Sequence, residues 1–419
     1  MADRHGTHRF LRSARSFVSG RIPTQLIIQL TDSCNAACPQ CGMRRNAPFR
    51  RSLLPTYDVQ RIIDHAADSG VAALSFTGGE PFIYADILLS LIRHAGNAGI
   101  PFIRTGTNGF LFQNPDQPDF DEKVSRLAES LAATPLHNFW ISIDSPVPEQ
   151  HERMRGLPGV IRGIERALPI FHEHGLFPSA NLEITKAILP KRSDAGDGDA
   201  VALEAYRAGF RAFFNRISEM GFTIVNACYP MSVETEAPNS LSAVYGATAA
   251  HDCVSFTRQE KVLMFRALRE TIPEFRSRIR IFSPLSSLHA LEKQYSGDAG
   301  YSRPCRGGAD FFFVGVNGGD TYPCGYRGRD NLGKFWDIDL KKQPLDTACR
   351  ECDWECFRDP SELLGPFREI FTAPIALARR LLQDTAHTDL WFNDLRYFWA
   401  AGFFSGRQPP DYAKLVRFA

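Results

Sequence analysis

The chain has 419 residues, of which 44% are hydrophobic and 23% charged, and its formal net charge is +1. This is the balance of a globular protein large enough for one α/β domain and a smaller unit, and it gives no reason to expect a nucleic-acid partner. No apolar run approaches the roughly 20 residues of a membrane span, and the N-terminus lacks the apolar core of a secretory signal, so we expect a cytoplasmic protein.

The cysteines are grouped rather than spread along the chain. Of the ten, three lie within residues 34–41 and five within residues 305–356. In a reducing cytosol, such groups indicate metal or redox chemistry rather than disulfides.

From residue 24 onward, short apolar runs alternate with stretches of helical periodicity. We expect Pro169 to break one of the helices near its end. In chain order, the expected elements are a strand over 24–30, a helix over 56–70, a strand over 72–80, a helix over 85–99, a strand over 101–109, a helix over 122–133, a strand over 137–145, a helix over 160–175, a strand over 179–189, a helix over 203–221 and a strand over 222–230.

This alternation predicts parallel strands joined by right-handed crossovers. Six strand–helix units indicate an α/β fold with an open, partial (βα)6 barrel of the TIM type rather than a closed eightfold barrel. Functional groups are then expected at the carboxyl ends of the strands, and the chemically suggestive residues do follow the predicted strands.

The whole chain divides into four predicted parts. Within the third part, Asn317-Gly318-Gly319 lies between two strand-like runs and predicts a hairpin turn. The parts are a basic N-terminal extension (1–23), the partial barrel (24–300), a small cysteine-rich unit (301–360) and an aromatic-rich helical tail (361–419).

The first cysteine group, Cys34, Cys38 and Cys41, directly follows the first predicted strand. Three thiolates on one tight loop can bind three irons of a cubane cluster and leave the fourth iron open to an amine and a carboxylate. The alternative is a structural zinc site, but zinc prefers four ligands and no local fourth Cys or His follows at zinc-finger spacing.

The spacing C-x3-C-x2-C after a first strand resembles the signature of the radical S-adenosylmethionine (SAM) superfamily, and Gly78-Gly79-Glu80-Pro81 after the second strand resembles that family's glycine-rich segment. The resemblance covers roughly residues 24–230 by the count of strand–helix units. It implies an enzyme in which a 4Fe-4S cluster reductively cleaves bound SAM to a 5′-deoxyadenosyl radical. It also implies that Gly78, Gly79, Glu80 and Pro81 meet the methionine amino group.

Other positions fit the family pattern more loosely. Arg155 resembles an arginine that pairs with the methionine carboxylate, whereas Gln40 departs from the aromatic residue that commonly precedes the third cysteine and packs near adenine. Ordinary strand-end capping or ion pairing is the alternative for each position. The further SAM-binding candidates are Thr107, Asn108, Ser142 and Asp144.

The second cysteine group resembles the SPASM/twitch extension of radical SAM enzymes, which holds auxiliary iron–sulfur clusters. Five cysteines are too few for a full two-cluster module, so one auxiliary 4Fe-4S cluster is expected. Cys305 and Cys324 are the expected ligands, with two more from Cys349, Cys352 and Cys356. A zinc ribbon is the alternative, since four thiolates also suit tetrahedral zinc.

We expect the enzyme to oxidise or otherwise modify a small molecule or lipid, with electrons from a donor such as flavodoxin or ferredoxin. A peptide-modifying enzyme is the first alternative, although the 23 residues before the first strand are too few for a leader-peptide-binding domain. A non-catalytic iron–sulfur electron carrier is the second alternative.

Two further features bear on function. Cys228 and Tyr229 follow the sixth strand, where a thiol could donate or accept a hydrogen atom, although a free cysteine is more often buried packing. The aromatic tail (391–404) and the N-terminal arginines could form a surface that contacts a membrane, although a tail packed over the barrel is the simpler reading. These arginines are Arg4, Arg9, Arg12, Arg15 and Arg21.

Overall fold

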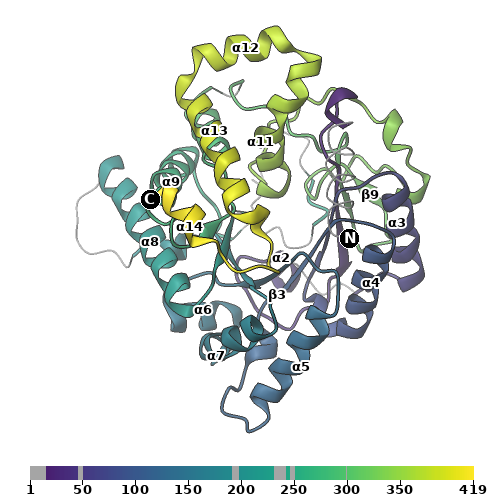
Figure 1. Cartoon of the computed structure of the whole chain (residues 1–419), viewed down its shortest axis with the longest axis vertical. Helices are drawn as coiled ribbons and strands as arrows, with labels where there is room; N and C mark the ends of the chain where they lie inside the picture. Colours follow the sequence, from purple (N-terminus) through teal and green to yellow (C-terminus); the bar gives the residue numbers. More distant parts are fainter. Residues whose placement is uncertain (1–15, 46–50, 191–197, 231–241, 246–250, 299) are drawn as a thin grey trace.

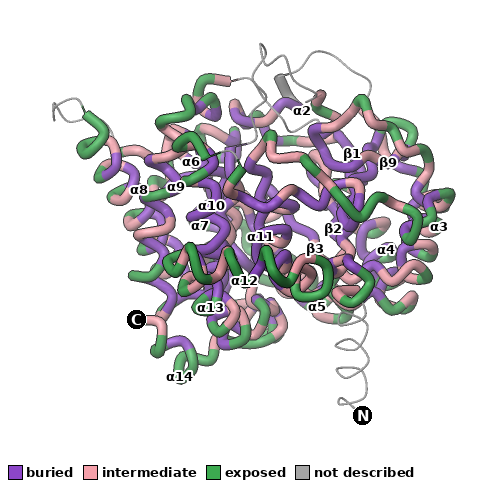
Figure 2. The backbone as a smooth tube through the Cα atoms, turned by 90° about the horizontal axis from the view of Figure 1, so that it is seen from above, coloured by how far each residue is buried: buried purple, intermediate pink, exposed green. Residues whose placement is uncertain are grey.

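The computed structural model describes residues 16–45, 51–190, 198–230, 242–245, 251–298 and 300–419, and these form an open parallel sheet surrounded by helices (Figure 1). Most residues of the strands are buried, while the outer helices expose one side to solvent (Figure 2). The tail helices α11, α12 and α13 lie at one side of the barrel, drawn at the top of Figure 1.

The sheet has nine strands in the order β7-β6-β5-β4-β3-β2-β1-β8-β9. Neighbouring strands pair in parallel throughout, except that β8 and β9 form an antiparallel hairpin. The strands are β1 (Gln25–Thr31), β2 (Ala73–Gly78), β3 (Phe102–Thr107), β4 (Asn138–Ser142), β5 (Ser179–Glu183), β6 (Ile224–Cys228), β7 (Arg280–Ile281), β8 (Phe311–Val314) and β9 (Thr321–Tyr322).

The helices cover the outer face of this sheet because their apolar residues recur with helical spacing. In α3, for example, Val59, Ile62, Ile63 and Ala66 are buried. The longer helices are α3 (Thr56–Asp68), α4 (Ala85–Asn97), α5 (Phe120–Ala132), α6 (Pro148–Arg155), α7 (Val160–Glu173), α8 (Asp199–Met220), α9 (Arg258–Thr271), α10 (Leu285–Tyr295), α11 (Glu355–Thr372), α12 (Pro374–Gln383) and α13 (Thr385–Ala400).

The expected open α/β barrel is confirmed, with three differences in its elements. Helix α7 continues through Pro169 to Glu173, because its apolar face, including Leu168 and Phe171, is fully buried and offsets the hydrogen bond that proline removes. Strand β7 was not predicted, since two residues are too few to show the alternation of apolar and polar side chains that indicates a strand. The hairpin β8–β9 was predicted, but its pairing with β1 was not.

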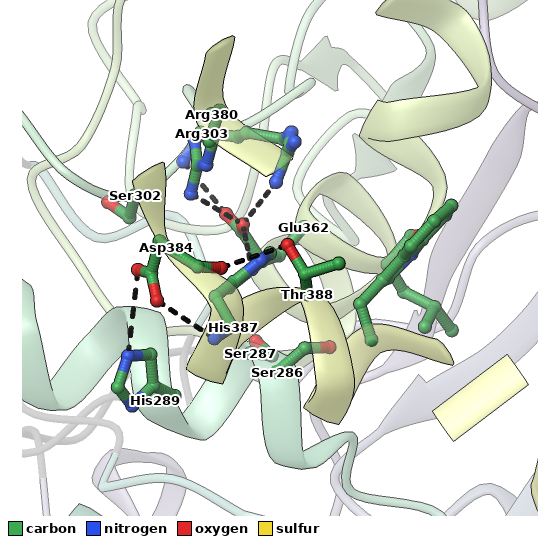
Figure 3. A network of polar contacts seen from close by, with 12 residues as sticks. Ser286, Ser287, His289, Ser302, Arg303, Glu362, Arg380, Asp384, His387 and Thr388 are labelled. Atoms are coloured by element: carbon green, nitrogen blue, oxygen red, sulfur yellow. Dashed lines mark hydrogen bonds and ion pairs between the residues drawn. The ribbon is translucent and has the colours of Figure 1, made fainter. Parts of the chain in front are cut away.

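Glu362 of α11 ties the tail helices to the cysteine-rich unit through a buried polar network (Figure 3). Its Oε1 accepts hydrogen bonds from Arg303 Nη1 (2.6 Å), Arg380 Nη2 (3.1 Å) and His387 Nε2 (3.0 Å). Burial alone would raise the pKa of Glu362, but Arg303, His387 and Arg380 lower it. The carboxylate is therefore ionised and holds α11, α12 and α13 together.

The end of the tail closes the barrel at the amino ends of its strands. Gly406 N donates to His137 O (2.9 Å), and Phe177 N donates to Gly406 O (2.7 Å). Asn138 Nδ2 donates to Phe404 O (3.3 Å), and the Phe404 side chain is buried. This segment therefore packs against the barrel, as the simpler reading of the sequence expected.

Parts of the proposed membrane-facing surface can be located in the structure. Trp399 is 63% exposed and Phe403 is 57% exposed, whereas Arg21 is held by the carbonyl oxygens of Ala309 and Gln343. Within the described residues, no helix is both long and apolar enough to cross a membrane. Arg4, Arg9, Arg12 and Arg15 lie outside the described residues.

Replacing Glu362 by Ala should destabilise the fold, because Arg303 would keep only Glu369 as a carboxylate partner and His387 would lose its buried acceptor. Breaking a buried pair in this way costs about 3–5 kcal/mol of unfolding free energy. The midpoint of thermal unfolding should fall clearly. Asp389→Ala, at an exposed position of α13, is the matched control and should change the midpoint little. Equal midpoints for the two variants would contradict the role of Glu362.

Candidate active site and metal centres

The barrel encloses a cavity of about 380 Å³ that runs along the inner face of the sheet. Alternate residues of the strands face it, because successive side chains of a strand lie on opposite faces. His137, Phe282 and Phe404 line it toward the amino ends of the strands, and the cysteine loop and the glycine-rich segment line it at the carboxyl ends.

Cys34, Cys38 and Cys41 all line this cavity, as the sequence predicted for one shared site. Ala37 N donates to Arg155 O (2.8 Å), which ties their loop to the end of α6. Burial raises the pKa of Cys38 to about 11 and that of Cys41 to about 12. Without metal these thiols keep their protons, and binding of metal would release them.

The glycine-rich segment packs directly on the backbone of the cysteine loop. Gly79 N donates to Thr31 O (2.8 Å), and Glu80 N donates to Ser33 O (2.8 Å). A Cβ atom at Gly79 would lie 2.1 Å from Ser33 O, and one at Gly78 would lie 2.1 Å from Thr31 O. Both positions therefore require glycine, because any side chain would force the two segments apart.

Glu80 is fully buried beneath this segment. Its Oε1 accepts a hydrogen bond from Phe82 N (3.0 Å), and its Oε2 accepts one from Asn108 N (2.6 Å). Burial raises the pKa of Glu80 to about 7 despite these bonds. A cationic ligand in the adjoining cavity would favour the carboxylate form.

Arg155 lines the cavity, but its guanidinium is held by Asp144 rather than free. Nε and Nη2 donate to the two Asp144 oxygens at 2.7 Å each, and Gln40 Nε2 donates to Asp144 Oδ2 (2.8 Å). Gln40, which departs from the family pattern, thus supports the Asp144–Arg155 pair. Of the other predicted SAM contacts, Thr107, Asn108 and Ser142 line the cavity, whereas Asp144 lies behind Arg155.

The side chains of Cys228, the last residue of β6, and Tyr229, the next residue, point to opposite faces of the sheet. Cys228 lines the cavity, and its Sγ donates to Asn181 Oδ1 (3.2 Å). The Tyr229 hydroxyl instead donates to the buried carboxylate of Asp359 (3.1 Å), outside the lining. Tyr229 is therefore not placed to contact a ligand in the cavity, in contrast to the expectation from the sequence.

The second cysteine group encloses a separate small cavity. Cys305, Cys324, Cys349 and Cys352 line it, and Trp354 forms a wall between it and the larger cavity. The fifth cysteine, Cys356, lines the larger cavity instead. The sequence left open which two of the last three cysteines would complete the auxiliary site. The lining of the small cavity favours Cys349 and Cys352.

Both cysteine groups line a cavity, which bears on whether they would hold a cluster or a single ion. Four thiolates around zinc lie within about 4 Å of one another, because each sulfur is about 2.3 Å from the metal. Among the described residues, no three His, Cys, Asp or Glu side chains are grouped to hold one metal ion. Each cysteine group lines a cavity, and three or four thiols facing one cavity suit a cubane cluster.

Sequence reasoning missed the polar residues inside the barrel. Arg104, Asn181, Asn226 and Glu355 all line the larger cavity. The signal that could have found the first three is the period of two within strands β3, β5 and β6, where polar residues alternate with buried apolar ones. Glu355 had no such signal, because it begins a helix far along the chain.

Residues 28–189 match the model of the Radical SAM superfamily. The chain is similar to the AdoMet-dependent heme synthase of Oleidesulfovibrio alaskensis, with 25% identity over 71% of this chain and 68% of the relative. It is also similar to that of Methanosarcina barkeri, with 22% identity over 82% and 87%. Among solved structures, Streptococcus suis SuiB bound to precursor peptide SuiA shares the fold, with a TM-score of 0.50 and 18% identity over 81% of this chain and 67% of that chain.

Replacing Asp144 by Ala should leave the Arg155 guanidinium buried without an acceptor and remove the anchor of Gln40. We expect a loss of about 3–5 kcal/mol in unfolding free energy and weaker iron retention at the first cysteine loop. Thermal unfolding and iron analysis after desalting would measure both. Asp116→Ala removes an exposed pair with Arg162 and should cost less than about 1 kcal/mol; a similar effect of the two variants would refute the proposed anchoring.

Proposed function

From the premise that the chain is a radical SAM enzyme, with residues 28–189 as its radical SAM domain, we propose that the barrel cavity is its active site. A 4Fe-4S cluster and SAM are the characteristic cofactors of the superfamily. When bound, they supply a radical that can abstract an unactivated hydrogen atom from a substrate. The protein supplies binding, orientation and exclusion of water.

We assign the first cluster to Cys34, Cys38 and Cys41. The three thiols share one wall of the cavity with Gly78, Gly79 and Pro81, so a ligand of the cluster would meet this backbone. Glu80 lies directly beneath and would stabilise an ammonium group. Arg155, already oriented by Asp144, would present its remaining amino group, Nη1, to a carboxylate.

We assign one auxiliary 4Fe-4S cluster to Cys305, Cys324, Cys349 and Cys352. Four cysteine ligands complete the coordination of a cubane, so this cluster would have no open iron for a substrate. Its role would be electron transfer, with an external donor such as flavodoxin or ferredoxin. Trp354 separates it from the active site by one side chain.

We propose a small molecule with an anionic group as the substrate, and the position of Arg104 carries this proposal. Arg104 lines the cavity, and its Nε donates to Ser75 Oγ (3.1 Å), while among the described residues Nη1 and Nη2 have no hydrogen-bond partner and could meet a ligand. The cavity volume of about 380 Å³ falls within the range of small-molecule sites, roughly 300–1,000 Å³. Asn181 and Asn226 add hydrogen-bonding groups to a lining that is otherwise mostly apolar, so the substrate would carry an apolar part beside its anionic group.

The relatives bear on the alternatives. The two heme synthases are named for a small-molecule product, which supports this class of substrate, although identity near 25% does not transfer the substrate itself. SuiB binds a precursor peptide, and a peptide remains the second candidate because the fold is shared. A non-catalytic electron carrier is inconsistent with a radical SAM enzyme, so that hypothesis was wrong.

The two clusters should be separable by mutation. Anaerobic reconstitution should give about eight irons per chain, four for each cubane. Replacing Cys34, Cys38 and Cys41 by Ala should remove about half of the iron and all SAM cleavage. Replacing Cys305 and Cys324 should also remove about half of the iron but spare some cleavage without substrate, measured as 5′-deoxyadenosine. Zinc without labile sulfide in the reconstituted protein would overturn the assignment.

A substrate should raise the formation of 5′-deoxyadenosine above the rate without substrate. We expect the small-molecule fraction of a cell extract to do so, and synthetic peptides not to. Arg104→Met should lose this stimulation, because an anionic group would have no buried cation to bind. Arg162→Met, at an exposed site, is the control. Stimulation by peptides that is unaffected by Arg104→Met would favour the peptide candidate.

A further inference from the structure

The fifth cysteine of the C-terminal group belongs to the active-site cavity rather than to the auxiliary site. Cys356 lies in the first turn of α11, four residues after Cys352. Cys352 lines the small cavity, and Cys356 lines the large one, on the far side of Trp354. The same cavity holds Cys34, Cys38 and Cys41, so Cys356 shares its space with the proposed SAM site.

Cys356 belongs to a group of three side chains, in which Glu355 is buried and the two cysteines are partly buried. Its thiol donates a hydrogen bond to Glu355 Oε1 (3.3 Å). The Glu355 carboxyl also forms a side-chain hydrogen bond with Cys228, and its Oε2 accepts a bond from Tyr229 N (3.3 Å). Two thiols from different elements, β6 and α11, thus meet one carboxyl group that the backbone holds in place.

The surroundings favour protonated thiols. Burial, followed by the nearby Glu355, raises the pKa of both Cys228 and Cys356 well above the usual value. Burial raises the pKa of Glu355 to about 7. The resident species are therefore S–H groups next to a carboxyl that can hold or release a proton, and a neutral S–H bond suits donation of a hydrogen atom.

We propose that Cys356 donates a hydrogen atom to the substrate radical in this cavity. The inference rests on the proposed function. It narrows the reaction from a net oxidation to one in which the substrate radical receives a new hydrogen atom. The Cys356 S–H bond breaks and a C–H bond forms on the substrate carbon. The resulting thiyl takes one electron from an iron–sulfur or flavin protein donor and one proton from Glu355, which solvent replaces. The substrate is neither oxidised nor reduced, and the new hydrogen comes from water, as in an epimerisation.

Cys356 is the better donor of the two thiols because of its partners. Both thiols neighbour the Glu355 carboxyl, but Cys356 donates directly to its Oε1 (3.3 Å), whereas the Cys228 thiol is shared with an amide oxygen, Asn181 Oδ1 (3.2 Å). Cys228 instead helps to position Glu355. Cys253 lines neither cavity, and its thiol contacts His251, so it serves as the control cysteine.

The placement of Cys356 can be tested without turnover. Protein loaded with iron and sulfide is prepared from the unaltered chain and from Cys356→Ser, and iron and labile sulfide are assayed. Cys356→Ser should keep about eight irons, as two intact cubanes require. Loss of about half of the iron in Cys356→Ser would make Cys356 a cluster ligand and overturn the proposal.

The donor role can be tested without the natural substrate. The loaded protein cleaves SAM in D2O with titanium(III) as reductant and no added thiol, and 5′-deoxyadenosine is analysed for deuterium. A Cys356 S–D bond in the cavity should deliver deuterium to the nucleoside, and Cys356→Ser should reduce the labelled fraction to natural abundance. The labelled fraction is independent of the rate of cleavage.

Matched variants decide between the thiols. Cys253→Ser should retain the label. Loss of the label in Cys228→Ser but not in Cys356→Ser would overturn the assignment to Cys356, and so would an unlabelled nucleoside from the unaltered protein. Absence of any 5′-deoxyadenosine would instead refute the proposed function, and the iron assay would still report whether Cys356 is a cluster ligand.

Discussion

The arrangement of the whole molecule depends on strand β1, which pairs with β2 on one side and with β8 on the other. The first cysteine loop leaves the end of β1, the glycine-rich segment leaves the end of β2, and the auxiliary cysteines surround the hairpin that begins with β8. Every side chain of β1 is buried, so its register is fixed by packing on both faces. Both cysteine sites are therefore positioned by one strand and share a rigid frame.

This frame places the first turn of α11 between the two sites. Trp354 packs on Phe357 at a ring distance of 4.8 Å and on Tyr326 at 5.7 Å, which fixes the start of the helix. The spacing from Cys352 to Cys356 then carries the chain from the lining of one cavity to that of the other. A helix in this position can place a thiol and a carboxyl in the barrel without adding a loop to it.

The sequence predicted the parts of the site that are local in the chain. The spacing of Cys34, Cys38 and Cys41 and the Gly78–Pro81 turn each lie on one segment, and the strand–helix alternation was sufficient to predict an open barrel. The role of Asp144 as the partner of Arg155, and the separation of Cys356 from the other late cysteines, depend on side-chain direction. The spacing of cysteines does not predict where each side chain points, because residues within one helical turn can face opposite sides.

The tail completes the site from the opposite end. Phe404 and the backbone of 404–406 cover the amino ends of β4 and β5, where an open barrel would admit water. Radical chemistry needs such exclusion, since an enclosed site limits side reactions of the intermediate. The aromatic residues that suggested a membrane surface thus have a role within the protein: Tyr397 and Phe404 are buried against the barrel, and Phe403 lines its cavity. The end of the tail is accordingly part of the wall of the cavity that we propose as the active site.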